Sequence, residues 1–264
     1  MRRDGGESNA GRRMIKLRNV HKRFGELVVL DGVDFDVDQG ETVSLLGPSG
    51  VGKSVLLKHI NGLIHPDVGE VFVDGLSVPH LKRKALSTLR STIGYVFQFG
   101  ALFDSMTVGE NVQLGITDEV CSSDQAYCRS RVTECLELVN LPVETALKYP
   151  SDLSGGMRKR VGIARAIAGQ PTYLLYDEPT SGLDPVNADI IDKLVVKLRD
   201  TIGVTSVVVT HDVKGAFFVS DRIALLREGS IRAMGTPDDI KASRDDAVRE
   251  FIERDFETFL DGDG

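Results

Sequence analysis

Hydrophobic and polar residues alternate along the first part of the chain, with the period of two that is typical of half-buried strands. Val33, Phe35 and Val37 alternate with aspartates, so one face of this segment is apolar and the other is charged. A similar pattern begins at Ile15 and Leu17. We therefore expect antiparallel strands at the start of the chain.

Further along, short apolar runs predict buried strands that are separated by helical segments. The expected strands lie at residues 43–46, 69–75, 93–97, 173–176, 204–210 and 223–226. Residues 53–63 have helical spacing, and residues 107–150 have helical patterns without a clear strand, which indicates a helical insertion. Strands that alternate with helices predict an α/β fold, in which a parallel sheet carries helices on both faces.

These patterns divide the chain into three parts. Residues 1–13 have little to bury and are expected to be a disordered leader, so that Met14 is a possible start. Residues 14–240 form one domain, with a helical subdomain at about 104–165. Residues 241–264 form an acidic tail with four basic and eight acidic side chains.

The tail also predicts an amphipathic helix, because its apolar residues fall on one face. Packing on its own domain and contact with a second subunit are the two alternatives for that face. The apolar residues are Val248, Phe251, Ile252, Phe256 and Phe259, and the opposite face carries Arg249, Glu250, Glu253, Arg254 and Glu257.

Composition excludes several classes of protein. The chain has 264 residues, 41% hydrophobic residues and 27% charged residues, which is ordinary globular usage. The net charge of −7 would repel the phosphates of a nucleic acid, so no nucleic-acid partner is expected. No apolar run approaches the roughly 18 residues of a membrane span, and the basic start lacks the apolar stretch of a secretory signal.

The cysteine count favours a reducing compartment and argues against a disulfide framework. Cys121, Cys128 and Cys135 are spaced seven apart. Seven helical residues rise about 10.5 Å, whereas bridged cysteines need Cα atoms within about 7 Å. A serine at 122 or 123 resembles a helix cap, which would place Cys121 outside the helix. We interpret all three as small apolar residues.

A glycine-rich segment matches the pattern G-x-x-x-x-G-K-[ST] of a phosphate-binding loop. Its glycines would let main-chain N–H groups surround the phosphates of a nucleotide, and Lys53 would reach the terminal phosphates. The Ser54 hydroxyl would bind Mg²⁺. An accidental glycine-rich turn is the alternative, but a buried strand precedes the segment and a helix follows it. The segment consists of Gly47, Pro48, Ser49, Gly50, Val51, Gly52, Lys53 and Ser54.

Two carboxylates follow the apolar strand at 173–176. Consecutive side chains on a strand point to opposite faces, so Asp177 and Glu178 are expected to do different work. Asp177 suits the outer shell of Mg²⁺, held through water or Ser54. Glu178 suits the role of general base toward the attacking water. An acidic turn without chemistry is the alternative, which the phosphate loop makes less favoured.

Together with further motifs in order, these residues resemble an ABC-type ATPase subunit over about residues 15–240. The resemblance implies a P-loop, RecA-like core with an antiparallel β subdomain and an inserted α-helical subdomain, and it implies ATP and Mg²⁺. The matching elements are Phe24 for adenine stacking, the Q-loop Gln98, the signature Leu153-Ser154-Gly155-Gly156-Met157, the D-loop Ser181-Gly182-Leu183-Asp184, and the switch His211.

Each matched residue has an expected role and an ordinary alternative. Ser154, Gly155 and Gly156 would bind phosphate through bare N–H groups, although a plain helix cap has the same pattern. His211 would hydrogen-bond the terminal phosphate region, and Gln98 would contact Mg²⁺ and the attacking water. A structural histidine, a solvated glutamine and a core Phe24 are the alternatives.

Finer features resemble the ATPases of Mla/Mce-type systems, which move phospholipids or other hydrophobic molecules. They are the Lys53-Ser54-Val55-Leu56-Leu57 segment, the apolar residues 99–106, and Met157 in place of the glutamine of many members. Residues 99–106 would line a groove for a permease helix, with burial under the helical insertion as the alternative. The resemblance implies a membrane permease, an Mce-domain protein, a homodimer of ATPase subunits, and a position on the cytoplasmic side of a bacterial inner membrane.

Three other functions compete with this interpretation. A polar-solute importer is the nearest alternative. A translation or DNA-repair ATPase is disfavoured because those proteins usually carry two cassettes or a long coiled-coil insertion. A cassette that binds ATP without hydrolysis is disfavoured by Glu178 and His211.

Overall fold

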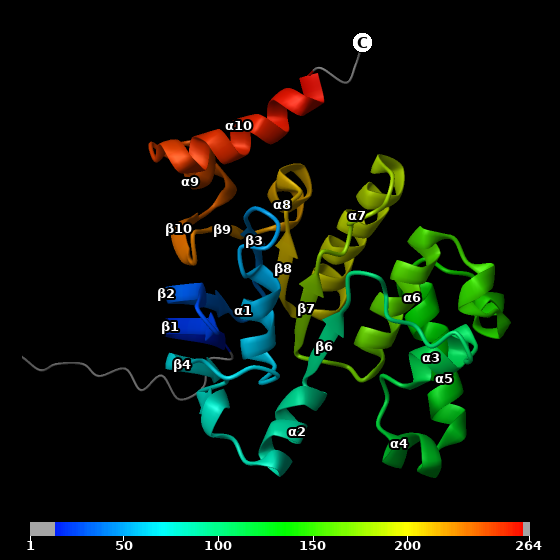
Figure 1. The fold of residues 1–264 in the computed structure, drawn as a ribbon. Coiled ribbons are helices and arrows are strands. Elements are labelled where there is room, and N and C mark those ends of the chain that lie inside the picture. Colours follow the sequence, from blue (N-terminus) through cyan, green and yellow to red (C-terminus); the bar gives the residue numbers. More distant parts are fainter. Residues whose placement is uncertain (1–13, 261–264) are drawn as a thin grey trace, which may run out of the picture.

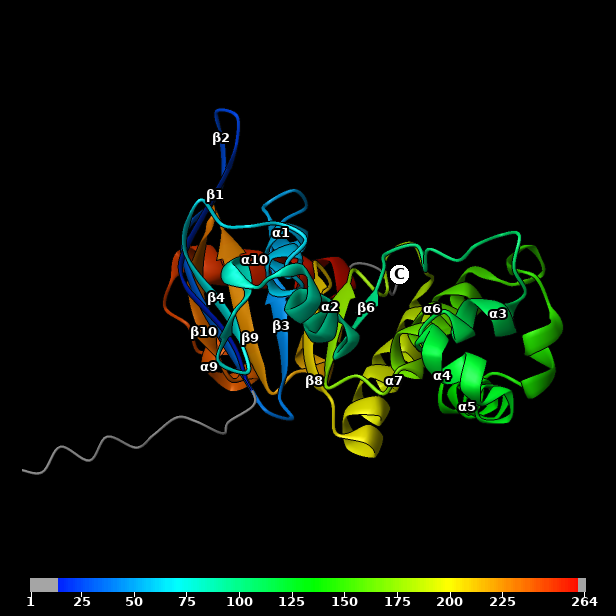
Figure 2. The ribbon, with the colours of Figure 1, turned by 90° about the horizontal axis from the view of Figure 1, so that it is seen from below.

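The computed structural model describes residues 14–260, with side chains described as far as Glu253, so the predicted leader at 1–13 lies outside the described residues. Two sheets pack around α1 (Figures 1 and 2). The smaller sheet is antiparallel with the strand order β2-β1-β4-β5. Its strands are β1 (Met14–Phe24), β2 (Leu27–Asp38), β4 (Val68–Val73) and β5 (Leu76–Ser77).

The larger sheet has the strand order β10-β9-β3-β8-β7-β6, and its strands are parallel except β10. Leu46 pairs with Thr210, and Asp177 pairs with Val209, so β3, β7 and β8 end at one edge. The loops that carry the candidate site leave from this edge. The strands are β3 (Thr42–Leu46), β6 (Ile93–Val96), β7 (Tyr173–Asp177), β8 (Thr205–Thr210), β9 (Arg222–Arg227) and β10 (Ser230–Gly235).

Alternation along β8 decides what each face of this sheet packs against. Val207 and Val209 join the core that contains α1 and the antiparallel layer. Val208 joins the other core, with the helices on the far face. The helices beside the sheet are α1 (Lys53–Ile60), α2 (Arg83–Ser91), α7 (Pro185–Ile202) and α8 (Val213–Val219), with the 3-10 turn η1 (Val78–His80).

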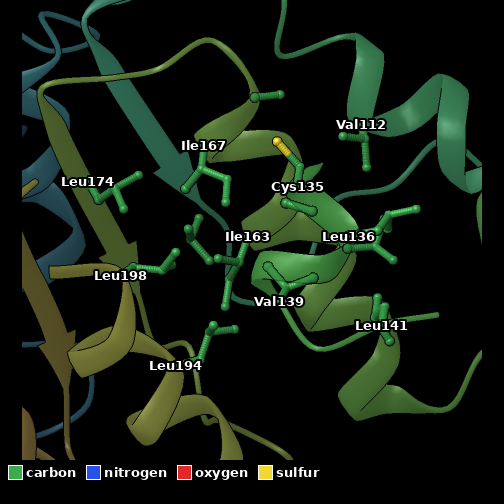
Figure 3. Close-up of a cluster of buried hydrophobic side chains, with 14 of the residues drawn as sticks. Val112, Cys135, Leu136, Val139, Leu141, Ile163, Ile167, Leu174, Leu194 and Leu198 are labelled. Carbon is green, nitrogen blue, oxygen red and sulfur yellow. The ribbon is translucent and has the colours of Figure 1, made fainter. Parts of the chain in front are cut away.

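The predicted helical insertion is present, and its core is continuous with the sheet. Figure 3 shows Leu136 and Ile163 packed toward Leu174 of β7 and Leu194 of α7. The helical subdomain therefore cannot move without disturbing buried contacts to the sheet. Its elements are α3 (Val108–Gln113), α4 (Asp118–Ser123), α5 (Gln125–Leu138), η2 (Val143–Leu147), η3 (Pro150–Asp152) and α6 (Gly155–Ala168).

The expectation that all three cysteines are small apolar residues without a disulfide is wrong for two of them. Cys121 lies in α4 and Cys128 lies in α5, and the two form a disulfide with Cα atoms 5.5 Å apart. The helical-rise argument fails because the helix breaks at Asp124, whose side chain caps α5 by accepting from Tyr127 N–H. Cys135 is a buried free thiol, and burial raises its pKa to about 11, as expected for a small apolar residue.

Helix α9 (Pro237–Lys241) ends where the predicted tail begins, and the tail forms α10 (Asp246–Leu260), beside α8 in Figure 1. Val248 and Ile252 are buried in a cluster with Val213 and Ala216 of α8. This part of the apolar face packs on its own domain. Phe256 and Phe259 lie beyond the side chains that are described. None of the helices within residues 14–260 has the length and apolar character needed to cross a membrane.

Candidate functional site

The phosphate loop connects β3 to α1, and two glycines make its path possible. Gly52 has a φ of 111°, and a Cβ at this position would meet the Val29 side chain at 2.8 Å. Gly47 also has a positive φ, and a Cβ there would collide with the Leu226 carbonyl. Gly52 is the N-cap of α1 and makes no side-chain cap hydrogen bond, so the first N–H groups of α1 remain for an anion.

Lys53 is buried and turned inward. Its Nζ donates to the carbonyls of Gly47 at 2.7 Å and Pro48 at 3.0 Å, and it lies 3.4 Å from Glu178 Oε1. Burial lowers the pKa of Lys53, and the Glu178 carboxylate opposes that shift. The ammonium therefore lies at the centre of the loop, where a terminal phosphate would meet it.

Asp177 is held from two sides at the end of β7. Ser54 Oγ donates to Asp177 Oδ1 at 2.6 Å, so the structure joins two of the three residues that the sequence assigns to Mg²⁺. Tyr95 Oη donates to Asp177 Oδ2 at 2.9 Å, and burial and Asp177 raise the tyrosine pKa. Tyr95 was not among the expected residues, because only the adjacency of β6 and β7 places it here.

The prediction that Asp177 and Glu178 point to opposite faces of one strand is wrong. β7 ends at Asp177, and Glu178 turns with a φ of 50° instead of continuing the strand. Glu178 therefore lies close to the phosphate loop beside Asp177 rather than on the opposite face. Its Oε2 lies 2.7 Å from His211 Nδ1, at the end of β8. His211 is 54% exposed, so it is not a buried structural histidine.

Lys53, Ser54, Glu178 and His211 line one cavity of about 400 Å³. Gln98 Nε2 donates to Ser181 Oγ at 3.1 Å, which fixes the glutamine at the rim. Phe24 is also exposed at the rim, with Lys22 Nζ 5.5 Å from its ring centroid, so it is not a core residue. The lining is Phe24, Val29, Ser49, Gly50, Gly52, Lys53, Ser54, Val55, Gln98, Glu178, Ser181 and His211.

The donor set of this cavity fits a magnesium nucleotide. Mg²⁺ prefers oxygen ligands, and it is usually held by one or two protein groups together with substrate phosphates. Ser54 and Asp177 supply a hydroxyl and a carboxylate, and Gln98 supplies an amide oxygen nearby. Within the described residues, no cluster of three histidine, cysteine or acidic residues forms a separate metal site.

The signature residues Ser154, Gly155 and Gly156 and the D-loop residue Asp184 are not part of the cavity lining, whereas Ser181 at the start of the D-loop is. Ser154 caps α6 by accepting from Met157 N–H at 3.3 Å, and Gly155 follows it. A Cβ on Gly156 would meet Asn187 Oδ1 at 2.6 Å, so this position has no room for a side chain. Asp184 caps α7, accepting from the Asn187 side-chain amide at 2.6 Å and from the Asn187 main-chain N–H at 3.1 Å, and these hydrogen bonds hold the pKa of Asp184 below its usual value. The structure does not bring these residues to their own chain's phosphate loop.

The segment 99–106 is partly exposed. Phe99 is 79% exposed and Phe103 is 56% exposed, whereas Leu102 packs against the helical core. Arg165 supports the segment by donating to the carbonyls of Gly100 at 2.7 Å and Ala101 at 2.6 Å. The alternative that this segment is buried under the helical insertion therefore holds for Leu102, but not for Phe99 or Phe103.

A family model described as ABC transporter matches residues 30–181. The sulfate/thiosulfate import ATP-binding protein of Bradyrhizobium diazoefficiens is 42% identical over 87% of this chain and 65% of that protein. The methionine import ATP-binding protein of Carboxydothermus hydrogenoformans is 42% identical over 86% and 67%. This chain thus spans about two thirds of those importer subunits. The intermembrane phospholipid transport ATP-binding protein of Escherichia coli is 36% identical over 91% and 88%.

Solved structures agree with this likeness. A dimeric ATP-binding cassette bound to ADP and Pi has a TM-score of 0.74 at 37% identity, and covers 84% of this chain and 98% of its own. The CbiO1 protein from Clostridium perfringens, part of an ABC transporter complex, has a TM-score of 0.80 at 29% identity and covers 90% of this chain and 94% of its own. The predicted fold class, an ATPase cassette with an α/β P-loop core, is confirmed.

Proposed function

The chain belongs to the ABC transporter family and has its ATPase cassette, and from this premise we propose that it hydrolyses MgATP to energise transport through a partner permease. One observation supports the proposal above others. Lys53, Ser54, Glu178 and His211 line a single cavity at three neighbouring strand ends. Asp177 joins them through its hydrogen bond with Ser54. This arrangement combines a phosphate cradle with a carboxylate placed for proton transfer.

Each residue then has a distinct task. The loop N–H groups and Lys53 bind and orient the terminal phosphates. Bound Mg²⁺ would neutralise phosphate charge, with Ser54, Asp177 and Gln98 holding it. Glu178 accepts the proton of the attacking water, and His211 keeps the Glu178 carboxylate oriented through their 2.7 Å contact. Phe24 offers an exposed aromatic face for the adenine.

The proposed working form is a homodimer. The signature residues Ser154, Gly155 and Gly156, together with Asp184, lie outside their own chain's cavity, so they are free to complete the site of a second copy. A related cassette is dimeric in its ADP-bound structure. A head-to-tail pair about a two-fold axis would use both signatures equally.

The cargo is proposed from the relatives, and a small polar solute has the broader support. The importer relatives act on sulfate, methionine and choline, and the first two are 42% identical to this chain. The phospholipid relative is the observation behind a second candidate, lipid-like cargo. An Mce-domain protein would be a partner only for that candidate. Either cargo places the chain on the cytoplasmic side of a bacterial inner membrane, bound to its permease.

The test of the ATPase is phosphate release by the purified chain with MgATP, alone and with membranes that contain the permease. Release that depends on Glu178 supports the function, whereas a wild-type chain that releases none under both conditions overturns it. For the cargo, a gene deletion is followed by uptake of sulfate, methionine and choline and by lipid distribution between membranes. Lost uptake with unchanged lipids favours the importer, and the reverse favours lipid cargo.

A further inference from the structure

Lys159 is a buried lysine in the first turns of α6. Its side chain is 7% exposed. Its Nζ donates to the carbonyl of Ser181 at 2.5 Å and lies 3.4 Å from the carbonyl of Glu178. Lysine is rarely buried without a compensating partner, because removing its charge from water is costly. Here the compensation comes from two main-chain carbonyls of one tight turn.

This turn has an unusual backbone. Glu178 has a φ of 50°, in the left-handed region that a side chain disfavours, so the surrounding contacts must hold it there. Glu178 N–H donates to the Val209 carbonyl at 2.9 Å, and Ser181 N–H donates to the Glu178 carbonyl at 3.2 Å. Lys159 binds the carbonyls of the same turn from α6, the helix that begins at the signature.

We propose that Lys159 is a positioning residue for ATP hydrolysis, which fastens the turn from Glu178 to Ser181 to helix α6 and so keeps the Glu178 carboxylate aimed at the nucleotide cavity. The inference rests on the proposed ATPase function. The same turn supplies Ser181 Oγ, which accepts from Gln98. One ammonium therefore holds the main chain on which both Glu178 and the anchor of Gln98 depend.

The charge of Lys159 strengthens this contact. Burial lowers its pKa to about 8, and the Glu178 carboxylate, the charged group that acts on it, opposes the shift. The ammonium is thus mostly charged at neutral pH and loses its charge as the pH rises through about 8. A neutral amine keeps N–H donors, but its hydrogen bonds to carbonyls are weaker than charge-assisted ones.

The experiment compares Lys159→Met and Lys159→Gln with Lys197→Met in the full chain. Lys197 is a matched control, because its Nζ also donates to a main-chain carbonyl, that of Leu138 at 2.7 Å, away from the cavity. For each variant, kcat and KM for ATP, the Kd of ATP and the melting temperature are measured between pH 6.5 and 9.5.

Lys159→Met should lower kcat by about tenfold or more with the Kd of ATP within about twofold, because misplacement of a reacting group costs rate rather than binding. The wild-type rate should fall above pH 8 as Lys159 loses its charge. Lys159→Gln should recover part of kcat and should not show that fall. Lys197→Met should keep the wild-type kcat and pH profile, whatever its melting temperature.

A Lys159→Met chain with wild-type kcat and pH profile overturns the inference. If Lys159→Met fails to fold, Lys159→Gln provides the test, and a wild-type kcat and pH profile in Lys159→Gln would also overturn the inference. A wild-type chain without hydrolysis, or one in which Glu178→Gln changes nothing, instead overturns the proposed ATPase function.

Discussion

The Lys53 ammonium faces the Glu178 carboxylate across the floor of the cavity, with Nζ and Oε1 3.4 Å apart. Both side chains are nearly enclosed, at 5% and 11% exposure. In the absence of phosphate, each charge compensates the other in a place that water reaches poorly. Removal of either side chain therefore affects both the chemistry and the balance of charge.

Lys53→Ala should weaken ATP binding by at least about a hundredfold, since the loop loses the cation that meets the terminal phosphates. Titration calorimetry with ATP measures this loss. Lys58→Ala on the same helix is the control and should bind ATP as the wild type does. ATP binding by Lys53→Ala at wild-type affinity would refute the assignment of Lys53.

Glu178→Gln should bind ATP normally and hydrolyse it about 10² to 10⁴ times more slowly, because an amide of the same shape cannot take the proton of the water. Phosphate release and ATP binding are measured on the same preparation. A turnover rate near that of the wild type would exclude Glu178 as the general base.

Glu178→Gln with MgATP should also form a dimer, since slow hydrolysis lets the state with both nucleotides bound accumulate. Light scattering with and without MgATP measures the shift in mass. Gly156→Leu in the same background should stay monomeric, because the space at Gly156 is already filled by Asn187 and an added side chain would disturb the signature. A strictly monomeric Glu178→Gln chain, with permease also present, would contradict the paired site.

The C-terminal helix α10 should stabilise its own domain. Val248 is fully buried, and Val248→Ala should lower the free energy of unfolding by about 1–3 kcal/mol. Arg249→Ala, half-exposed on the next residue, should change it by less than about 0.5 kcal/mol. Urea unfolding measures both. Truncation after Ala242 that weakens dimerisation at unchanged stability would instead support an intersubunit role.

The sequence predicted features that depend on neighbours along the chain. The phosphate loop was predictable because its strand, glycines and helix are contiguous. The direction of Glu178 was not, because a φ of 50° at one residue cancels the alternation of the strand before it. The disulfide was missed because one break at Asp124 folds two helices together. Tyr95 and Lys159 reach the site only through the order of the strands and the packing of α6, which no local pattern encodes.

Two carboxylates meet where α7 packs on α8. A Cβ on Gly215 would lie 2.8 Å from Asp212 Oδ2 and 2.9 Å from Asp192 Oδ2, so both point at the same small space. Burial raises the pKa of Asp192 to about 7, Asp212 and Asp189 add to the shift, and Lys214 opposes it. The negative charge of Asp212 nearby makes the ionised form of Asp192 less favourable.

This raised pKa predicts how stability depends on pH. The unfolded chain releases the Asp192 proton near pH 4, whereas the folded chain keeps it until about 7, so between these values the folded state binds more protons. The free energy of unfolding should therefore fall as the pH rises from 4 to 7, by at most about 1.4 kcal/mol per pH unit from this group. Asp192→Asn removes the titration and should flatten that slope, while Asp189→Asn, in an exposed ion pair with Lys193, should keep most of it. Urea unfolding at pH 5, 6, 7 and 8 measures the slopes, and equal slopes in the wild type and Asp192→Asn would show that Asp192 ionises normally in the folded chain.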